Sequence, residues 1–213
     1  AAEALVALAL ANSGEPRIQV AIKSSSLTHA AVMLKIIFQA QAKAPANLLS
    51  DLIRFAILDD NLRPLAKVLD ETAAEKDLER QFTLMAGFVD AIGQRKESLD
   101  QFQERLAKNS KGGIQAIETV FSNVRATAQD EDAEEATKIS AIKLLGRGPT
   151  RQREDMGLLS KLLAADKLPF IRKSALNALP KLSHSLTASA LLAQWNSYGP
   201  NERPGRWPQP RPR

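Results

Sequence analysis

The chain has 213 residues, no cysteine, only two histidines (His29 and His184) and a formal net charge of +5. The lack of cysteine excludes thiolate nucleophiles, disulfides, iron–sulfur clusters and covalent CxxCH haem attachment, and two histidines disfavour a histidine-based metal site or catalytic triad, so the composition speaks against an enzyme or a bound cofactor. Alanine and leucine, both strong helix formers, contribute 33 and 29 residues, and we therefore expect an all-α protein.

Apolar residues recur at helical spacing along almost the whole chain, and Gly, Pro, Asn or Ser interrupts them at short intervals. Phe82, Met85, Phe88 and Ile92, for example, fall on one stripe that predicts a helix with one buried face. Alternation with period two is nowhere sustained, so no strand is expected. The pattern predicts twelve helices, over residues 1–12, 16–25, 27–42, 46–59, 62–74, 77–94, 98–109, 113–129, 132–146, 151–165, 169–182 and 186–198.

Several residues at the helix boundaries support these limits. Pro16 and Pro169 are each predicted to open a helix, because the first-turn N–H has no helical partner to lose. Ser98 and Thr150 precede apolar runs and are predicted to cap the free N–H groups that follow them. Gly146 follows an apolar run, where a left-handed residue without a Cβ closes a helix at least cost.

Helices of three or four turns are marginal alone and have to pack on their neighbours. Successive antiparallel helices with short connections form either a closed bundle or an open stack of helix pairs. Twelve helices are many for one closed bundle. The sequence therefore predicts a right-handed α-α superhelix, an α-solenoid, of about five to six helix pairs over residues 1–198.

The positive charge is concentrated at the C-terminal end. Residues 199–213 contain four arginines, one glutamate and five prolines, which gives a local net charge of +3 and predicts a disordered tail. Residues 1–198 then carry only 5 − 3 = +2, which does not favour a general phosphate-binding surface. No run reaches the roughly 18–20 apolar residues that cross a bilayer, so no membrane span is expected.

The segment that starts at Asp166 and includes Pro169, Ile171, Arg172, Ala175 and Ala178 resembles the second helix of a HEAT repeat. In that family an Asp in the turn, a Pro, a Val or Ile, an Arg and then small residues occur in this order. The small residues let paired helices approach closely. The resemblance implies that Asp166 and Arg172 tie adjacent repeats through charge-assisted hydrogen bonds, as structural rather than catalytic positions.

A broader resemblance covers roughly residues 17–203. The segments FTLMAGFVDAIGQRKESLDQF (82–102), TKISAIKLLGRGP (137–149), PFIRKSALNALPKL (169–182) and ALLAQWNSYGPNER (190–203) resemble the HEAT region of large planctomycete-type proteins. Those proteins often combine a dehydrogenase-like β-propeller, a HEAT stretch and a C-terminal haem-binding CxxCH domain. The resemblance implies a fragment of such an exported protein, in the periplasm or cell envelope; the residues after Arg203 depart from the family pattern.

Other sequence features that could carry chemistry have simpler structural explanations. The acidic run 130–135 lacks the glycine and the ligand spacing of a calcium loop, and acids are favoured at a helix start. The Gly-rich spots at 112–113 and 146–148 lack the spacing of a phosphate-binding loop. We therefore predict no catalytic, cofactor-binding or metal-binding residue.

The interaction candidates are basic and aromatic residues. Four arginines, at helix ends that could line one face of the stack, and one tryptophan within the Pro/Arg-rich tail form this set: Arg125, Arg147, Arg151, Arg153 and Trp207. The sequence favours a non-catalytic scaffold or protein-interaction segment whose partner is a protein or a neighbouring domain of the same chain. The alternative is a HEAT-type nucleic-acid-binding or base-repair protein, which the nearly balanced charge and the few aromatics disfavour.

Overall fold

The computed structural model describes residues 1–181, apart from residues 41, 43, 60–61, 110–111 and 165. Over these residues the chain is helical with no strand, which confirms the predicted all-α class. One 3-10 turn, η1, spans Leu179–Lys181. The α-helices of the described part are α1 (Ala2–Ala11), α2 (Pro16–Ser26), α3 (Ala30–Gln39), α4 (Ala46–Leu58), α5 (Leu62–Ala74), α6 (Leu78–Gln94), α7 (Leu99–Asn109), α8 (Ile114–Gln129), α9 (Glu135–Leu144), α10 (Gln152–Leu162) and α11 (Pro169–Ala178).

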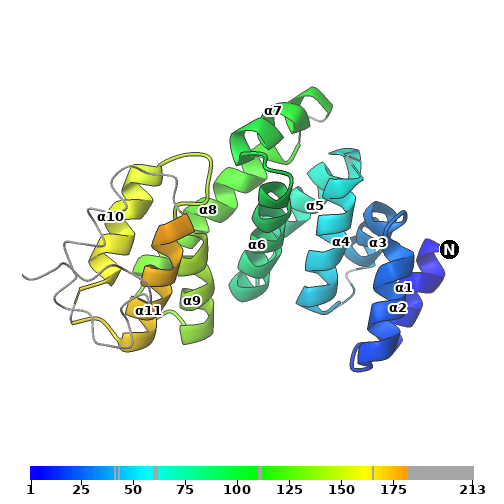
Figure 1. The fold of residues 1–213 in the computed structure, drawn as a ribbon, viewed down its shortest axis with the longest axis horizontal. Helices are drawn as coiled ribbons and strands as arrows, with labels where there is room; N and C mark the ends of the chain where they lie inside the picture. Colours follow the sequence, from blue (N-terminus) through cyan, green and yellow to red (C-terminus); the bar gives the residue numbers. More distant parts are fainter. Residues whose placement is uncertain (41, 43, 60–61, 110–111, 165, 182–213) are drawn as a thin grey trace, which may run out of the picture.

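The helices form an elongated stack of two layers, which Figure 1 shows from the N-terminal end at the right to α10 and α11 at the left. In one layer α1 packs on α3, α3 on α5, and α5 on α8. In the other layer α2 packs on α4, α4 on α6, α6 on α9, and α9 on α11. Within each pair the two helices also contact each other across the layers, so the predicted solenoid of helix pairs is confirmed, with the pairs α1/α2, α3/α4, α5/α6, α8/α9 and α10/α11.

Helix α7 lies outside this alternation. It packs on α5, α6 and α8 rather than continuing either layer, and it projects from the stack in Figure 1. Its buried residues are Leu99, Phe102 and Leu106, at the spacing of one helical face. The sequence pattern located this helix but contained no sign that it is an insertion between two pairs.

The boundary residues act largely as predicted. Pro16 and Pro169 open α2 and α11, and Gly146 has the left-handed φ of +76°. The Ser98 hydroxyl accepts a hydrogen bond from the Gln101 N–H, while the Gln101 side chain accepts one from the Ser98 N–H, which makes a reciprocal capping box. The prediction for Thr150 was wrong: Arg151 precedes α10, and the Thr150 hydroxyl donates to the Glu118 carboxylate instead.

In most pairs, a side chain of the second helix donates a hydrogen bond to carbonyl groups at the C-terminal end of the first helix. The fourth residue of α2, Gln19, donates to the Ala9 and Asn12 carbonyls at the end of α1. The fourth residue of α6, Gln81, donates likewise at the end of α5, and that of α9, Lys138, donates to the Asp130 carbonyl after α8. These side chains satisfy carbonyls that have no partner within their own helix. The contact therefore recurs in the pairs α1/α2, α5/α6 and α8/α9, whereas α4 has the apolar Leu49 at this position.

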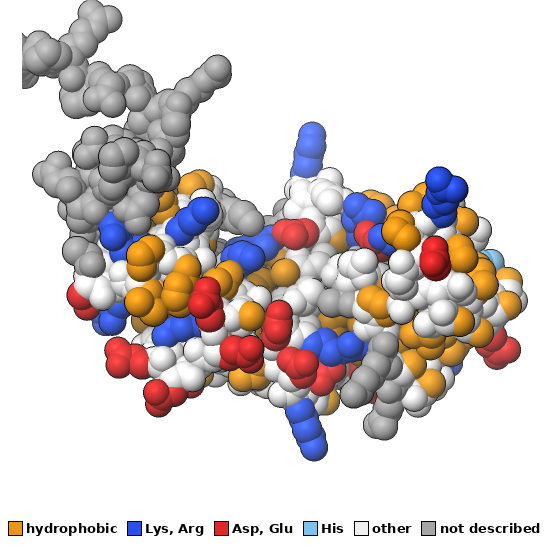
Figure 2. Space-filling model, turned by 90° about the horizontal axis from the view of Figure 1, so that it is seen from below, with side chains coloured by type: hydrophobic (Ala, Val, Ile, Leu, Met, Phe, Trp, Pro, Cys, Tyr) orange, Lys and Arg blue, Asp and Glu red, His pale blue; other side chains and the backbone are white. Residues whose placement is uncertain are grey.

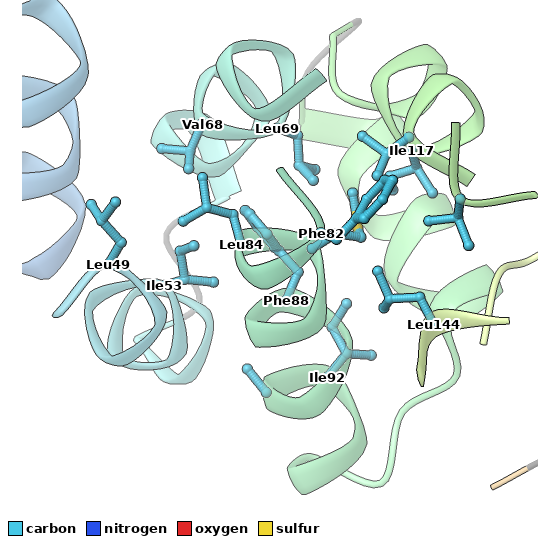
Figure 3. Packing of buried hydrophobic residues seen from close by; sticks show 14 of the residues in the cluster. Leu49, Ile53, Val68, Leu69, Phe82, Leu84, Phe88, Ile92, Ile117 and Leu144 are labelled. Atoms are coloured by element: carbon cyan, nitrogen blue, oxygen red, sulfur yellow. The ribbon is translucent and has the colours of Figure 1, made fainter. Parts of the chain in front are cut away.

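The core runs along the interior between the two layers. Figure 3 shows Leu84 of α6 pointing toward Ile53 of α4 and Val68 of α5, whereas Phe82 of the same helix points toward Ile117 of α8. All these side chains are at most 2% exposed. Because α6 has apolar residues on both flanks, it joins the N-terminal and C-terminal halves into one continuous core.

Two sequence predictions fall beyond this description. The predicted helix at 186–198 and the predicted disordered tail at 199–213 both lie outside the described residues. Within the described part of the chain, no single helix combines the length and the apolar composition needed to cross a membrane.

Candidate interaction surface

Arg125 was predicted to be an interaction candidate, and the structure contradicts this. Its guanidinium lies inside the stack, where Nε donates to Asp155 Oδ1 at 2.6 Å and Nη2 donates to Oδ2 at 3.3 Å. The Arg125 and Asp155 side chains are 7% and 0% exposed. The sequence reasoning failed because Arg125 sits on the buried face of α8, where a charge is tolerated only when it is paired.

This ion pair is part of a larger network that attaches α10 to α8. Arg125 Nη2 also donates to the Thr150 carbonyl at 2.9 Å, and Asp155 Oδ2 accepts from the Gly146 N–H at 2.9 Å. The network thus joins the middle of α8, the α9–α10 loop and the first turn of α10. It is a contact between successive helix pairs, the role that the HEAT resemblance implies for Asp166 and Arg172.

Arg147, Arg151 and Arg153 do not converge on a common site. The Arg147 side chain is 12% exposed and forms an ion pair with Asp90 of α6. Arg151 is exposed just before α10, with Nη1 3.8 Å from Glu154 Oε2, and Arg153 is exposed within α10. The predicted basic face is therefore divided between a buried pair, a bridge to α6 and two exposed side chains, and Trp207 lies outside the described residues.

Asp166 and Arg172 were predicted to tie adjacent repeats. Asp166 is exposed in the α10–α11 loop, with Oδ2 3.8 Å from the Lys167 ammonium. Arg172 is half-buried at the fourth position of α11, the position that Gln19, Gln81 and Lys138 occupy in their own helices. The roles predicted for Asp166 and Arg172 as ties between repeats stay predictions.

An open groove lies between α3 and α5 on the outer side of their layer. Its narrower part has a volume of about 250 Å³, and its floor is formed by Phe38 of α3 with Pro64 and Val68 of α5. Lys35 stands on one side and Lys67 on the other, both exposed. The basic side chains therefore face each other across an apolar floor.

The groove continues past the ends of α3 and α5, where it widens to a further 630 Å³. The two parts share Phe38 and Glu71. Beyond Glu71 the walls carry Glu75 and Asp77, together with Lys76 and Arg80. The Arg80 guanidinium is engaged structurally, since Nε lies 3.1 Å from Glu75 Oε2 and Nη1 donates to the Ala44 carbonyl at 2.9 Å.

The groove has opposite charge character at its two ends. Within the described part of the chain, the Lys35, Lys67 and Glu71 side chains make no ion pair, so these charges face solvent. The C-terminal ends of α3 and α5 also lie at the wider end, and helix C-termini carry partial negative charge. The narrower end therefore carries two lysines unpaired with any described residue, whereas the wider end carries three acidic and two basic side chains together with the two helix C-termini.

A second hollow, of about 380 Å³, lies at the other end of the stack between α8, α10 and α11. Its floor is apolar, with Leu158, Leu162 and Ile171 among its residues. At its rim the Lys167 ammonium lies 3.6 Å from Glu131 Oε1. Among the described residues, no group of three or more His, Asp or Glu side chains is placed to hold a metal ion.

Elsewhere the charges are mixed. Figure 2 shows basic and acidic side chains interspersed over one long face, and hydrophobic side chains exposed at the end formed by α1 to α4. The exposed apolar residues at that end include Leu8, Val20, Leu27 and Val32. Large apolar patches on a surface mark interaction sites more often than chance.

The comparisons with known proteins give no relative. No protein-family model, no curated protein and no solved structure matches this chain. The functional argument therefore depends on the residues and their geometry.

Sequence reasoning missed the α3–α5 groove. The available signal was α3 itself, AAVMLKIIFQ, whose apolar residues cover more of the helix than a single buried face requires. Phe38 lines the groove and is only partly buried against the core, and Val32 of the same helix is 49% exposed. Its pairing with Lys67 and Glu71 of α5 could not be read from spacing, since it depends on which helices are neighbours.

Proposed function

We propose that this chain is a non-catalytic α-solenoid scaffold that binds protein segments. The observation that carries the proposal is the open groove between α3 and α5, an apolar floor with charged walls on the outside of a continuous two-layer stack. Repeat proteins bind other macromolecules through the extended surfaces that their stacked helices form.

The resemblance of residues 17–203 to HEAT regions suggests a setting for this function. We propose that the segment belongs to a larger exported protein, between a dehydrogenase-like propeller and a haem domain. There it would fix the separation and relative orientation of its neighbours. A solenoid with one continuous core is suited to this role because each helix pair is held by the next.

The rigidity that a scaffold needs is directly measurable. The chain contains no cysteine, so single cysteines introduced at exposed Ser24 of α2 and Lys173 of α11 would carry spin labels without background. We expect pulsed electron–electron double resonance to give a narrow distribution of the distance between the two labels. The distribution should be the same at low and high salt. A broad or bimodal distribution would contradict the scaffold role.

The alternative, a nucleic-acid-binding role, makes a different prediction. A phosphate-binding surface gives an affinity that falls by orders of magnitude between about 50 and 200 mM salt. We expect no salt-sensitive binding of duplex DNA by residues 1–198, because Arg125 and Arg147 are engaged within the fold. Tight, salt-sensitive binding that Arg151→Glu and Arg153→Glu abolish would instead favour the alternative.

A further inference from the structure

The charge pattern of the α3–α5 groove specifies more than a generic protein partner. We infer that the groove binds an extended peptide segment. The segment has an acidic residue at position i, an apolar residue at i+2 and a basic residue at i+4. This inference rests on the proposed protein-binding function and names the chemistry of its ligand. The acidic residue of the peptide lies between Lys35 and Lys67, and its apolar residue lies over Phe38 and Val68. Its basic residue lies at the wider end of the groove, beyond Glu71.

The spacing of the ligand follows from the geometry of α5. A helix rises about 1.5 Å per residue, so Glu71 lies about 6 Å beyond Lys67 along the axis, and Ala74, the last residue of α5, about 10 Å beyond it. An extended chain rises about 3.3 Å per residue, so four residues cover about 13 Å and reach just past the end of α5, where Glu75 and Asp77 line the groove. Side chains at positions i, i+2 and i+4 of an extended chain point to one side, so all three can face the groove.

Three features distinguish the two ends. The two exposed lysines are free of ion pairs with described residues, so an incoming carboxylate does not have to displace an existing partner. At the wider end, Glu71 is likewise unpaired among the described residues, whereas Glu75 shares its charge with Arg80. The C-terminal ends of α3 and α5 add negative potential there, which favours a cation in the ligand.

Selection from a random library tests the motif without assuming a sequence. The full chain is immobilised and panned with phage displaying random twelve-residue peptides. We expect the recovered peptides to be enriched in an acidic, an apolar and a basic residue at alternate positions, in either chain direction. Recovery of peptides without this pattern would overturn the inference.

Variants of the protein then locate the binding site. A fluorescein-labelled copy of the most enriched peptide is titrated by anisotropy with wild type and with Lys35→Glu/Lys67→Glu. Like charges placed against the peptide's acidic residue should weaken binding about tenfold or more. The matched control, Lys143→Glu/Lys173→Glu, changes the net charge equally at exposed positions of α9 and α11 and should leave the affinity unchanged.

A compensating peptide separates electrostatic recognition from damage to the fold. Replacing the peptide's acidic residue by lysine should weaken binding to wild type and restore binding to Lys35→Glu/Lys67→Glu. Thermal unfolding of each variant confirms that it folds. If peptides bind equally well to the groove variant and the control variant, the groove inference fails. The distance measurement between α2 and α11 would then still decide the scaffold proposal independently.

Discussion

At the residue scale, the polar side chains that enter the helix stack bind the ends of neighbouring helices. Gln81 is fully buried, and its Nε2 donates to the Thr72, Ala73 and Glu75 carbonyls at 3.0 to 3.2 Å. Its Oε1 accepts a hydrogen bond from Asn123 of α8 at 3.0 Å. The side-chain amide of Gln81 thus connects α5, α6 and α8, and each of these hydrogen bonds is made by its nitrogen or its oxygen.

We therefore expect Gln81→Leu to lower the free energy of unfolding by about 1–3 kcal/mol, since buried carbonyls and the Asn123 amide lose their partner. Urea denaturation followed by circular dichroism measures the change. The control is Gln94→Leu, in the last turn of the same helix but exposed, which should stay within about 0.5 kcal/mol of wild type. Equal effects of the two substitutions would show that the buried amide has no special role.

The buried pair of Arg125 and Asp155 gives a larger expected effect. Asp155→Asn leaves the Arg125 guanidinium buried without a countercharge and should cost about 3–5 kcal/mol. Asp90→Asn is the matched control, because Asp90 also pairs with an arginine but is 61% exposed, and it should cost less than about 1 kcal/mol. Thermal melting of both variants compares them.

Replacing both charged residues shows whether the instability of Asp155→Asn comes from the unpaired charge that remains buried. Arg125→Met with Asp155→Leu should recover most of the loss, since apolar residues of similar volume often replace a buried ion pair at little cost. A double variant as unstable as Asp155→Asn would mean that the hydrogen bonds to Gly146 and Thr150, rather than the paired charges, hold α10 in place.

At the element scale, the junction between α7 and α8 depends on one glycine. Gly113 has a φ of +86°, and a Cβ there would lie 2.8 Å from Leu106 Cδ2 and 3.2 Å from the Ala66 backbone. The Gly113 N–H also donates to Asp70 Oδ1 of α5 at 2.9 Å. The start of α8 is therefore held close to both α5 and α7, which is how the inserted helix fits without separating the layers.

Gly113→Ala should accordingly destabilise the protein, by more than about 1 kcal/mol, because alanine is strained at positive φ and has no space here. Gly157→Ala is the matched control: Gly157 lies inside α10 with no atom within 4 Å of an added Cβ. That substitution should stabilise α10 by about 0.5–1 kcal/mol. Melting temperatures that shift in the same direction for both variants would contradict this account.

At the scale of the whole molecule, the helices differ in how many neighbours hold them. α6 contacts α4, α5, α7, α8 and α9, and its packing on α4 is the most extensive helix contact in the described stack. α1 packs mainly on α2 and α3. Because a solenoid is held together by nearest neighbours, its stability should be lowest where neighbours are fewest.

Amide hydrogen exchange measures this gradient. We expect amides in the middle of α6 to be protected about a hundredfold or more above those of α1, since opening free energies range from near zero at frayed ends to the global value in the core. Mass spectrometry of peptides covering each helix resolves the difference. Equal protection of α1 and α6 would indicate one cooperative globule instead of a stack.

The sequence by itself determined the helices and their buried faces. The stripe from Phe82 to Ile92 predicted α6 correctly because helix periodicity and amphipathicity are local properties, and Pro16, Ser98 and Gly146 act through their own backbone. Their alternation along the chain was enough to indicate a stack of pairs.

Only the tertiary structure decided which surface positions are paired and which are free. Nothing in the sequence distinguishes Arg125 from Arg151. Arg125 pairs inside the core with Asp155, thirty residues further along the chain, whereas Arg151 faces solvent. The groove between Lys35 and Lys67 likewise exists because α3 and α5 are neighbours in one layer. Such pairings join residues distant in sequence, so local periodicity carries no information about them, and packing between helices alone determines them.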